Sequence, residues 1–326
     1  MHAPYPALRL RRTRAHAWSR AMVAETRLSP SDLIWPIFVT SGERERLRTL
    51  PFVERVPLAE VGAAARTARA AGIPCIALFP HGEPRSEHAV AALAPDNLMC
   101  RAIAEAKTAC PEVGVLADVA LDPYTSHGHD GVLDARGRVD NDATLDLLVA
   151  QALVQARAGA DILAPSDMMD GRIGRIRAAL EADGFHDAQI MAYAAKYASA
   201  LYGPFREAVG SAGALKGDKR GYQMDYANSD EALREVGLDL AEGADTVMVK
   251  PGLAYLDILA AVRARFRIPT FAYHTSGEAA MIEGAVALGA LDRNAAIIEV
   301  LTAFKRAGAA GVLTYHALDA ARLITV

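Results

Sequence analysis

The chain has 326 residues, of which 52% are hydrophobic and 23% are charged, and its formal net charge is −4. This composition excludes an intrinsically disordered chain, and the small negative charge excludes the broad positive field that nucleic-acid binding requires. No apolar run is long enough to span a bilayer. We therefore expect a globular cytoplasmic protein that binds neither nucleic acid nor membranes.

The first 24 residues carry five arginines and no acidic residue. No apolar core of a secretory signal follows them. An organelle transit peptide stays an open alternative, although the segment is poor in serine. Pro4 and Pro6 favour an extended start, as in an exposed arm. We predict that residues 1–27 form an arm that packs on another subunit, and that residues 28–326 form one domain.

Eight short apolar runs follow the arm, and each is continuously apolar rather than alternating. That pattern is typical of parallel strands that are buried on both faces. The predicted strands cover residues 33–39, 73–79, 113–119, 161–164, 189–193, 246–249, 269–273 and 311–315.

Segments between these runs repeat apolar residues with the helical period, and several end at or near a glycine that fits a helix terminus. The predicted helices cover residues 58–71, 143–158, 231–241 and 294–307, with Asp292 capping the last. Eight strand–helix units predict a (β/α)₈ barrel. A doubly wound open sheet is the alternative, but no Gly-x-Gly-x-x-Gly follows the first strand to indicate a dinucleotide site.

Barrel enzymes carry their active sites at the carboxyl ends of the strands. Polar and reactive side chains are found at or just after these ends in this sequence. They are Asp118, Asp122, Ser166, Tyr193, Lys196, Lys250, Tyr273, Ser276 and Tyr315.

Two of these residues are lysines on consecutive strands, so we expect both at the same mouth of the barrel. Lys250 ends an apolar strand, where desolvation lowers the pKa of an amine and makes it a nucleophile. A second ammonium at Lys196, about 4 Å away, would add a repulsion of roughly 4 kcal/mol, or about three pKa units. The alternative is a Lys250 that extends into solvent. The pair predicts Schiff-base chemistry on carbonyl substrates.

The segment from Lys196 to about Ser229 is long and rich in glycine, and its basic residues outnumber its acidic ones up to Gln223. These features predict a lid over the barrel mouth that accepts an anionic substrate. Arg206 is suited to bind a carboxylate through two hydrogen bonds. The alternative is a solvated surface loop.

Two further groups of residues could bear chemistry. His127 and His129 form a His-x-His pair that could ligate zinc, although no further ligands are evident and a polar loop is an equal alternative. The three cysteines, Cys75, Cys100 and Cys110, match no zinc spacing and are too few for a disulfide framework. We expect them to be reduced core thiols.

Several motifs together resemble the porphobilinogen synthase family, also called 5-aminolevulinate dehydratase. They are R-L-R-R-T-R, A-P-S-D-M-M-D-G, M-A-Y-A-A-K-Y-A-S-A-L-Y-G-P-F-R, K-G-D-K-R-G-Y-Q-M-D, M-V-K-P-G and S-G-E. The resemblance implies a (β/α)₈ barrel whose arm embraces a neighbour, in a hexamer or octamer built from dimers. It implies an enzyme that condenses two 5-aminolevulinate molecules into porphobilinogen and releases two waters.

The resemblance also implies roles for individual residues. Lys250 would form a Schiff base with the first substrate, and Lys196 would engage the keto group of the second. The second carboxylate would be held by Arg206, Lys219 and Gln223, with Lys219 standing where many relatives have arginine. Around the first substrate, the resemblance implies that Asp118 contacts the amine and that Ser276 and Tyr315 hold the carboxylate. It also implies that Ser166, Tyr193 and Tyr273 line this site.

The chain departs from the zinc-dependent branch of the family, which has three cysteines in the loop after the third strand. The matching positions here are Ala120, Asp122 and Asp130, so thiolate zinc binding is not expected. The two carboxylates could hold a hard cation or, as we favour, bind a substrate ammonium. Glu235 matches a glutamate that binds a stimulatory Mg²⁺ in some relatives, and a solvated helix face is the alternative.

Other functional classes stay open at this point. A Schiff-base aldolase of class I would need Lys250 but neither Lys196 nor a cationic lid. A metal-dependent barrel hydrolase would use His127 and His129. A non-enzymatic scaffold is disfavoured, because a buried lysine pair is costly without a function.

Overall fold

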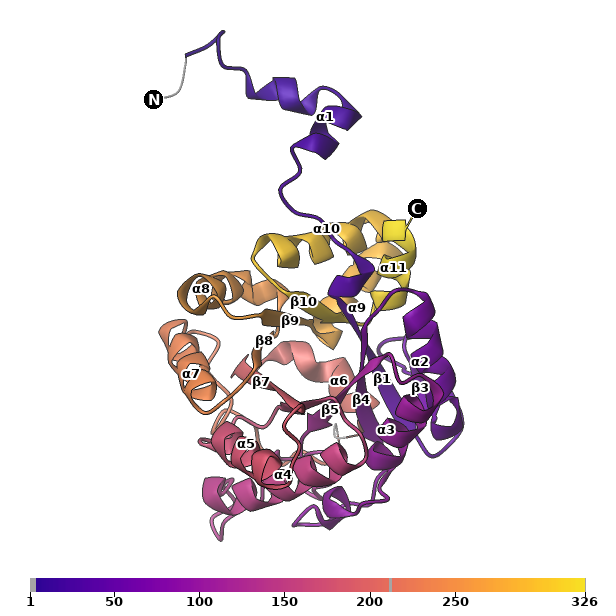
Figure 1. Cartoon of the computed structure of the whole chain (residues 1–326), viewed down its shortest axis with the longest axis vertical. Helices are drawn as coiled ribbons and strands as arrows, with labels where there is room; N and C mark the ends of the chain where they lie inside the picture. Colours follow the sequence, from indigo (N-terminus) through magenta and orange to yellow (C-terminus); the bar gives the residue numbers. More distant parts are fainter. Residues whose placement is uncertain (1–3, 211–212, 326) are drawn as a thin grey trace.

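A computed structural model describes residues 4–210 and 213–325, and eight parallel strands form its centre. The strands are hydrogen-bonded in chain order, and β10 pairs with β1, which closes the barrel and confirms the predicted (β/α)₈ architecture (Figure 1). The strands are β1 (Leu33–Thr40), β4 (Cys75–His81), β5 (Gly114–Val119), β6 (Ile162–Pro165), β7 (Gln189–Lys196), β8 (Thr246–Lys250), β9 (Thr270–His274) and β10 (Gly311–Thr314).

Helices surround the barrel, and the four predicted ones are present with ends shifted by only a few residues. The surrounding helices are α2 (Val61–Ala70), α3 (Leu98–Ala109), α4 (Asn141–Arg157), α5 (Arg172–Ala182), α7 (Asp230–Ala241), α8 (Leu256–Phe266), α9 (Ser276–Ala287), α10 (Arg293–Arg306) and α11 (Ala317–Thr325). Gly159, Gly243 and Gly308 follow helices with φ between 103° and 106°, a conformation that favours glycine. Asp292 caps α10 by accepting a hydrogen bond from the Ala295 N–H.

Two apolar layers explain the continuously apolar strands. Alternate side chains of each strand point into the barrel or outward against the helices, and both sets are buried. In β1, for example, Phe38 belongs to the inner layer, and its neighbours Ile37 and Val39 belong to the outer one. The inner layer closes the barrel interior, so the reactive side chains lie only at its mouth.

A hairpin between β1 and α2 was not predicted from the sequence. Its strands are β2 (Glu45–Arg46) and β3 (Glu54–Pro57), and β3 runs parallel to the end of β1. The pattern is hard to find in the sequence because both strands are short and both residues of β2 are exposed.

The N-terminal segment extends away from the barrel (Figure 1). It contains a short 3₁₀ helix (Leu10–Arg14) and α1 (Ala17–Met22). Large apolar side chains are solvent-exposed here, including Leu10, Trp18 and Met22. Among the described residues, no helix is long and apolar enough to cross a membrane.

Candidate active site

Lys196 and Lys250 lie side by side at the carboxyl end of the barrel, as the strand order predicted. They end the adjacent strands β7 and β8 and are direct partners in the strand register. An irregularity in β7 between Ala192 and Ala195 shifts the register just before this pair. Both lysines are buried, with 5% and 4% of their surfaces exposed.

Lys250 lies among aromatic rings. Its Nζ is 4.3 Å from the ring centroid of Tyr273, 4.5 Å from that of Phe205, and 5.2 to 5.3 Å from those of Tyr193 and Tyr202. Burial and, after it, the charge of Lys196 lower the pKa of Lys250 to about 7, against the opposite effect of Asp118 and the other nearby carboxylates. Desolvation is the main cause, although the spacing of the two lysines in the sequence had indicated their repulsion as the main one.

Lys196 has polar partners instead. Its ammonium donates a hydrogen bond to the Ser166 carbonyl at the end of β6, and its Nζ is 3.9 Å from Asp130 Oδ1. The two lysines therefore have different surroundings within one site, since Lys250 is surrounded by aromatic rings and Lys196 lies beside a carboxylate.

Asp118, at the end of β5, lies close to the lysine pair. Burial raises the pKa of its carboxyl, and the charges of Lys250 and Lys196 lower it. Its Oδ1 has no hydrogen-bond partner among the described residues, so it is free to accept one from a ligand. The amide of Gln155 on α4 donates to the Asp118 carbonyl, and that of Gln151 donates to Ala120. We missed these two glutamines, although their i, i+4 spacing in an apolar helix was a usable signal.

Lys219 pairs with two carboxylates, those of Asp122 and Asp130. Its Nζ is 3.1 Å from Asp122 Oδ2 and 2.8 Å from Asp130 Oδ2, and all three side chains are buried. Burial lowers the pKa of Lys219, but the two carboxylates outweigh it and the pKa is raised. Burial raises the pKa of Asp130, but the charge of Lys219 and that of Lys196 outweigh it and the pKa is lowered. This ion triad ties the predicted lid to the loop after β5.

The predicted carboxylate-binding residues also lie around the mouth. Ser276 Oγ accepts a hydrogen bond from the Phe205 N–H at 2.9 Å, and the hydroxyls of Tyr273 and Tyr315 are 2.9 Å apart. The Tyr193 hydroxyl and Gln223 Oε1 are buried without hydrogen-bond partners among the described residues.

The predicted lid covers the lysines. It contains the short helix α6 (Gly203–Ala208), and two of its residues, Ser211 and Ala212, lie outside the described part of the chain. Arg206, Lys219 and Gln223 of this segment line a cavity with both lysines. The cavity measures only about 20 Å³, which is room for about one water molecule.

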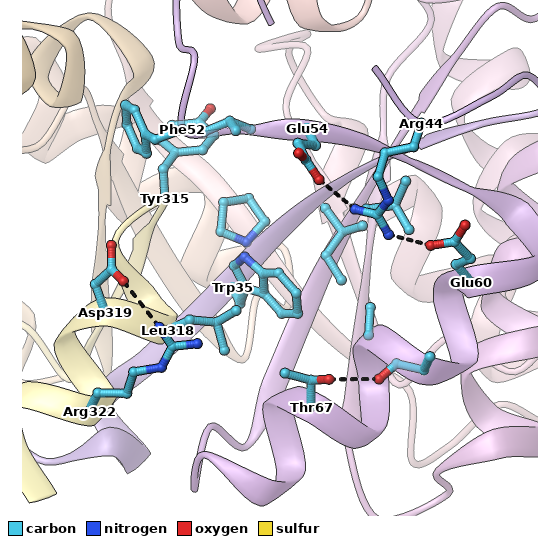
Figure 2. A pocket seen from close by; sticks show the side chains of 16 residues that line it. Trp35, Arg44, Phe52, Glu54, Glu60, Thr67, Tyr315, Leu318, Asp319 and Arg322 are labelled. Atoms are coloured by element: carbon cyan, nitrogen blue, oxygen red, sulfur yellow. Dashed lines mark hydrogen bonds and ion pairs between the residues drawn. The ribbon is translucent and has the colours of Figure 1, made fainter. Parts of the chain in front are cut away.

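A larger cavity of about 380 Å³ lies under the β2–β3 hairpin (Figure 2). Trp35, Phe52 and Leu318 supply its apolar wall. Its charged side chains pair with one another, as in the contact of Arg44 with Glu54. None of the predicted site residues except Tyr315 lines it.

The two histidines that could ligate a metal, His127 and His129, each have hydrogen-bond partners of their own. Nε2 of His127 contacts the Glu87 carbonyl, and the ring nitrogens of His129 contact the Tyr222 hydroxyl and the Lys216 carbonyl. Within residues 4–210 and 213–325, no three His, Cys, Asp or Glu side chains form a metal-binding group. A hydrolase site built on this pair is thus not supported.

The remaining predicted groups lie away from the lysine pair. The three cysteines are free and buried, and burial raises the pKa of the Cys75 thiol to about 12. Glu235 is half-buried on α7, and burial followed by the nearby Asp239 raises the pKa of its carboxyl. It lines a cavity of about 850 Å³ together with Asp170 and Glu231.

Comparison with known proteins agrees with this geometry. Residues 7–323 match the family model described as delta-aminolevulinic acid dehydratase. Enzymes of that name from Bradyrhizobium diazoefficiens and Rhodobacter capsulatus are 57% and 52% identical to this chain, covering 97% and 98% of it and 90% and 98% of their own lengths.

A solved structure shows the same fold. The delta-aminolevulinic acid dehydratase (porphobilinogen synthase) of Toxoplasma gondii, in complex with the reaction product porphobilinogen, superposes with a TM-score of 0.94 at 46% identity. The alignment covers 97% of this chain and 91% of that one. The resemblance seen in the sequence motifs is confirmed, and the chain belongs to the delta-aminolevulinic acid dehydratase family.

Proposed function

We propose that the chain condenses two molecules of 5-aminolevulinate into porphobilinogen with the release of two waters. The observation that carries this proposal is the buried lysine pair, with Lys196 and Lys250 in register on adjacent strands. Each lysine can form a Schiff base with the keto group of one substrate. A single-lysine aldolase needs no second buried amine, and a buried amine is costly to maintain without a role.

Lys250 is suited to form the first Schiff base. Its pKa of about 7 leaves much of the amine uncharged and nucleophilic at neutral pH. Attack on the keto carbon gives a carbinolamine, and loss of one water gives the iminium, which withdraws electrons from the adjacent carbons. Asp118 lines the same cavity as Lys250. Its Oδ1 has no hydrogen-bond partner among the described residues and would hold the substrate amine. Ser166, Tyr193 and Tyr273 would enclose this substrate.

Lys196 would bind the keto group of the second substrate beside the first. Its present partners, the Ser166 carbonyl and Asp130, are polar groups that a bound substrate can displace or share. Forming one C–C bond and one C–N bond between the two substrates then releases both lysines and, overall, two waters. Holding both reactants in attack geometry is worth up to about 7–11 kcal/mol.

The two carboxylates would bind at opposite sides of the mouth. Arg206, Lys219 and Gln223 on the lid would hold that of the second substrate, with the Gln223 amide NH₂ as the donor, since all three side chains line the cavity. Ser276 and Tyr315 would hold that of the first. To donate to a carboxylate, the Ser276 hydroxyl has to give up the hydrogen bond that it now donates to the Leu201 carbonyl at 3.4 Å.

We also propose that the reaction uses no thiolate-bound zinc and no organic cofactor. The side chains at the matching positions, Asp122 and Asp130, are paired with Lys219. Binding of Mg²⁺ at Glu235 is a separate proposal. This ion commonly keeps several waters and binds one or two carboxylates. Glu235 lines a cavity of about 850 Å³ together with Asp170 and Glu231.

Self-association through residues 1–27 is the proposed assembly, as a hexamer or octamer built from dimers. Its support is the extended arm, whose side chains of Trp18 and Met22 are 66% and 75% exposed in the single chain. A second subunit would cover these apolar surfaces. Buried free thiols agree with the proposed cytoplasmic location.

The experiment is a product assay with the purified full-length chain and 5-aminolevulinate. The proposal predicts one porphobilinogen for every two substrates consumed, identified by mass, with activity kept in a zinc-selective chelator. Consumption of substrate without porphobilinogen would contradict the condensation. Loss of activity with the chelator would contradict the zinc-free site alone.

A further inference from the structure

The carboxyl end of the lid helix α6 is held by two arginines that lie outside the proposed catalytic groups. Arg55, on β3, donates hydrogen bonds to the carbonyls of Glu207 and Ala208, at 2.7 and 3.0 Å. Arg85, after β4, donates to the carbonyl of Val209 at 3.3 Å. The last carbonyls of a helix have no partners within it and attract cations, so both arginines fit this end of α6.

Each arginine is also anchored to the barrel. Arg85 donates to the carbonyls of Asp122 and Thr125, both at 3.0 Å, and so joins the lid to the loop that carries the proposed site carboxylates. Arg55 is 8% exposed and pairs with Glu45 of the same hairpin. The arginines therefore connect α6 to the β2–β3 hairpin and to the loop after β5.

The Glu207 side chain strengthens the contact between the lid and the hairpin. Its carboxylate accepts hydrogen bonds from the backbone N–H groups of Arg48 and Thr49, at 3.0 and 3.2 Å, and from the Thr49 hydroxyl. These donors lie in the turn between β2 and β3. The hairpin thus holds the lid through both the backbone and a side chain of α6.

The position of α6 controls the surroundings of Lys250. Phe205 of this helix covers the Lys250 amine at 4.5 Å, and Arg206 lines the same cavity. Because that cavity has room for about one water, 5-aminolevulinate cannot enter until α6 moves. The contacts that hold α6 must then break and form again in each catalytic cycle.

We propose that Arg55 and Arg85 form a latch that holds α6 closed over the lysine pair and sets the balance between the open and closed lid. They are positioning residues, since neither touches the reacting amines. A closed lid keeps water from the Schiff bases and completes the substrate site. Weakening the latch lowers the fraction of closed lid, which raises the substrate concentration needed for closure.

The test compares Arg55→Met, Arg85→Met and the double variant with the wild type, using hydrogen exchange of the full-length protein without substrate. Arg157→Met is the matched control, because Arg157 pairs with Asp183 and contacts none of the described lid residues. We expect backbone amides of residues 203–210 to exchange about ten-fold faster in the double variant, with the rest of the barrel unchanged. Arg55→Lys keeps a cation at the helix end and should recover part of the protection.

Kinetics supply a second readout. The double variant should raise KM for 5-aminolevulinate about ten-fold and change kcat less than about three-fold, because saturating substrate itself closes the lid. Unchanged exchange at residues 203–210 would overturn the latch, as would faster exchange spread evenly over the barrel. The kinetic readout rests on the proposed condensation, whereas the exchange readout does not, so either proposal can fail alone. Arg85→Met, at a half-exposed residue, keeps the test decisive if Arg55→Met does not fold.

Discussion

The cavity at the barrel mouth measures about 20 Å³, whereas the pocket under the hairpin measures about 380 Å³ (Figure 2). In the larger pocket, charged side chains such as Arg44 and Glu54 pair with each other near solvent. In the smaller one, two lysines are buried together, and Asp118 keeps a free oxygen. Buried and incompletely paired charges are typical of active sites, so the smaller cavity rather than the larger one is the candidate active site.

Tyr315 is the one predicted site residue shared by these two regions. Its side chain lines the larger pocket, while its hydroxyl contacts the Tyr273 hydroxyl of the mouth. Burial raises the pKa of both phenols, so both remain protonated hydrogen-bond donors at neutral pH.

The largest expected effect is the difference in kcat/KM between a mutation at the barrel mouth and one in the larger pocket. Lys250→Met should lower kcat/KM by at least about a thousand-fold, because it removes the nucleophile that fixes the first substrate. Arg44→Met, in the larger pocket, should change kcat/KM by less than about three-fold, since exposed ion pairs contribute little. Steady-state kinetics with melting temperatures as a folding control make the measurement. A folded Lys250→Met protein with near-normal turnover would break the comparison.

A smaller effect is expected at the neighbouring residues Lys219 and Arg220. Lys219→Met should raise KM for 5-aminolevulinate by about 10- to 100-fold, because it removes a buried charge-assisted hydrogen bond. Lys219→Arg should keep most of the affinity. Arg220→Met is the control, since Arg220 pairs with Asp218 at the surface and should leave KM within about two-fold. Equal KM values for the Lys219→Met and Arg220→Met variants would argue against the role of Lys219.

The pH dependence should show the smallest effect. Only the uncharged Lys250 amine attacks a carbonyl, so the rate of adduct formation should rise about ten-fold per pH unit up to about 7 and level off above. A rate that continues to rise to pH 9 would indicate an ordinary, solvated lysine. In the unfolded chain this lysine is protonated up to about pH 10, so its unfavourable contribution to stability should diminish as the pH rises from 7 to 10.

The barrel was largely predictable, because its strands and helices follow local patterns. All eight strands were found from continuous apolar runs, and Asp292 and Gly308 marked helix ends correctly. The adjacency of Lys196 and Lys250 also followed from strand order alone. These features depend on residues close in sequence or on one rule of barrel topology.

Long-range contacts were not predictable in the same way. The triad of Lys219 with Asp122 and Asp130 joins segments about ninety residues apart, and no local pattern indicates it. Arg55 reaches across the sequence to α6 from a hairpin too short to recognise. The aromatic rings around Lys250 were not predictable either, because two of them belong to Phe205 on α6 and to Tyr202 just before this helix.

Borohydride reduction in the presence of 5-aminolevulinate, followed by peptide mass mapping, tests the central claim most directly. The account predicts a reduced adduct on the peptide that contains Lys250, with a second adduct on Lys196 when substrate is in excess. Lys250→Met should abolish the first adduct, while Lys196→Met should keep it and still make no porphobilinogen. The absence of any adduct on Lys250 in an active wild-type preparation would contradict the account.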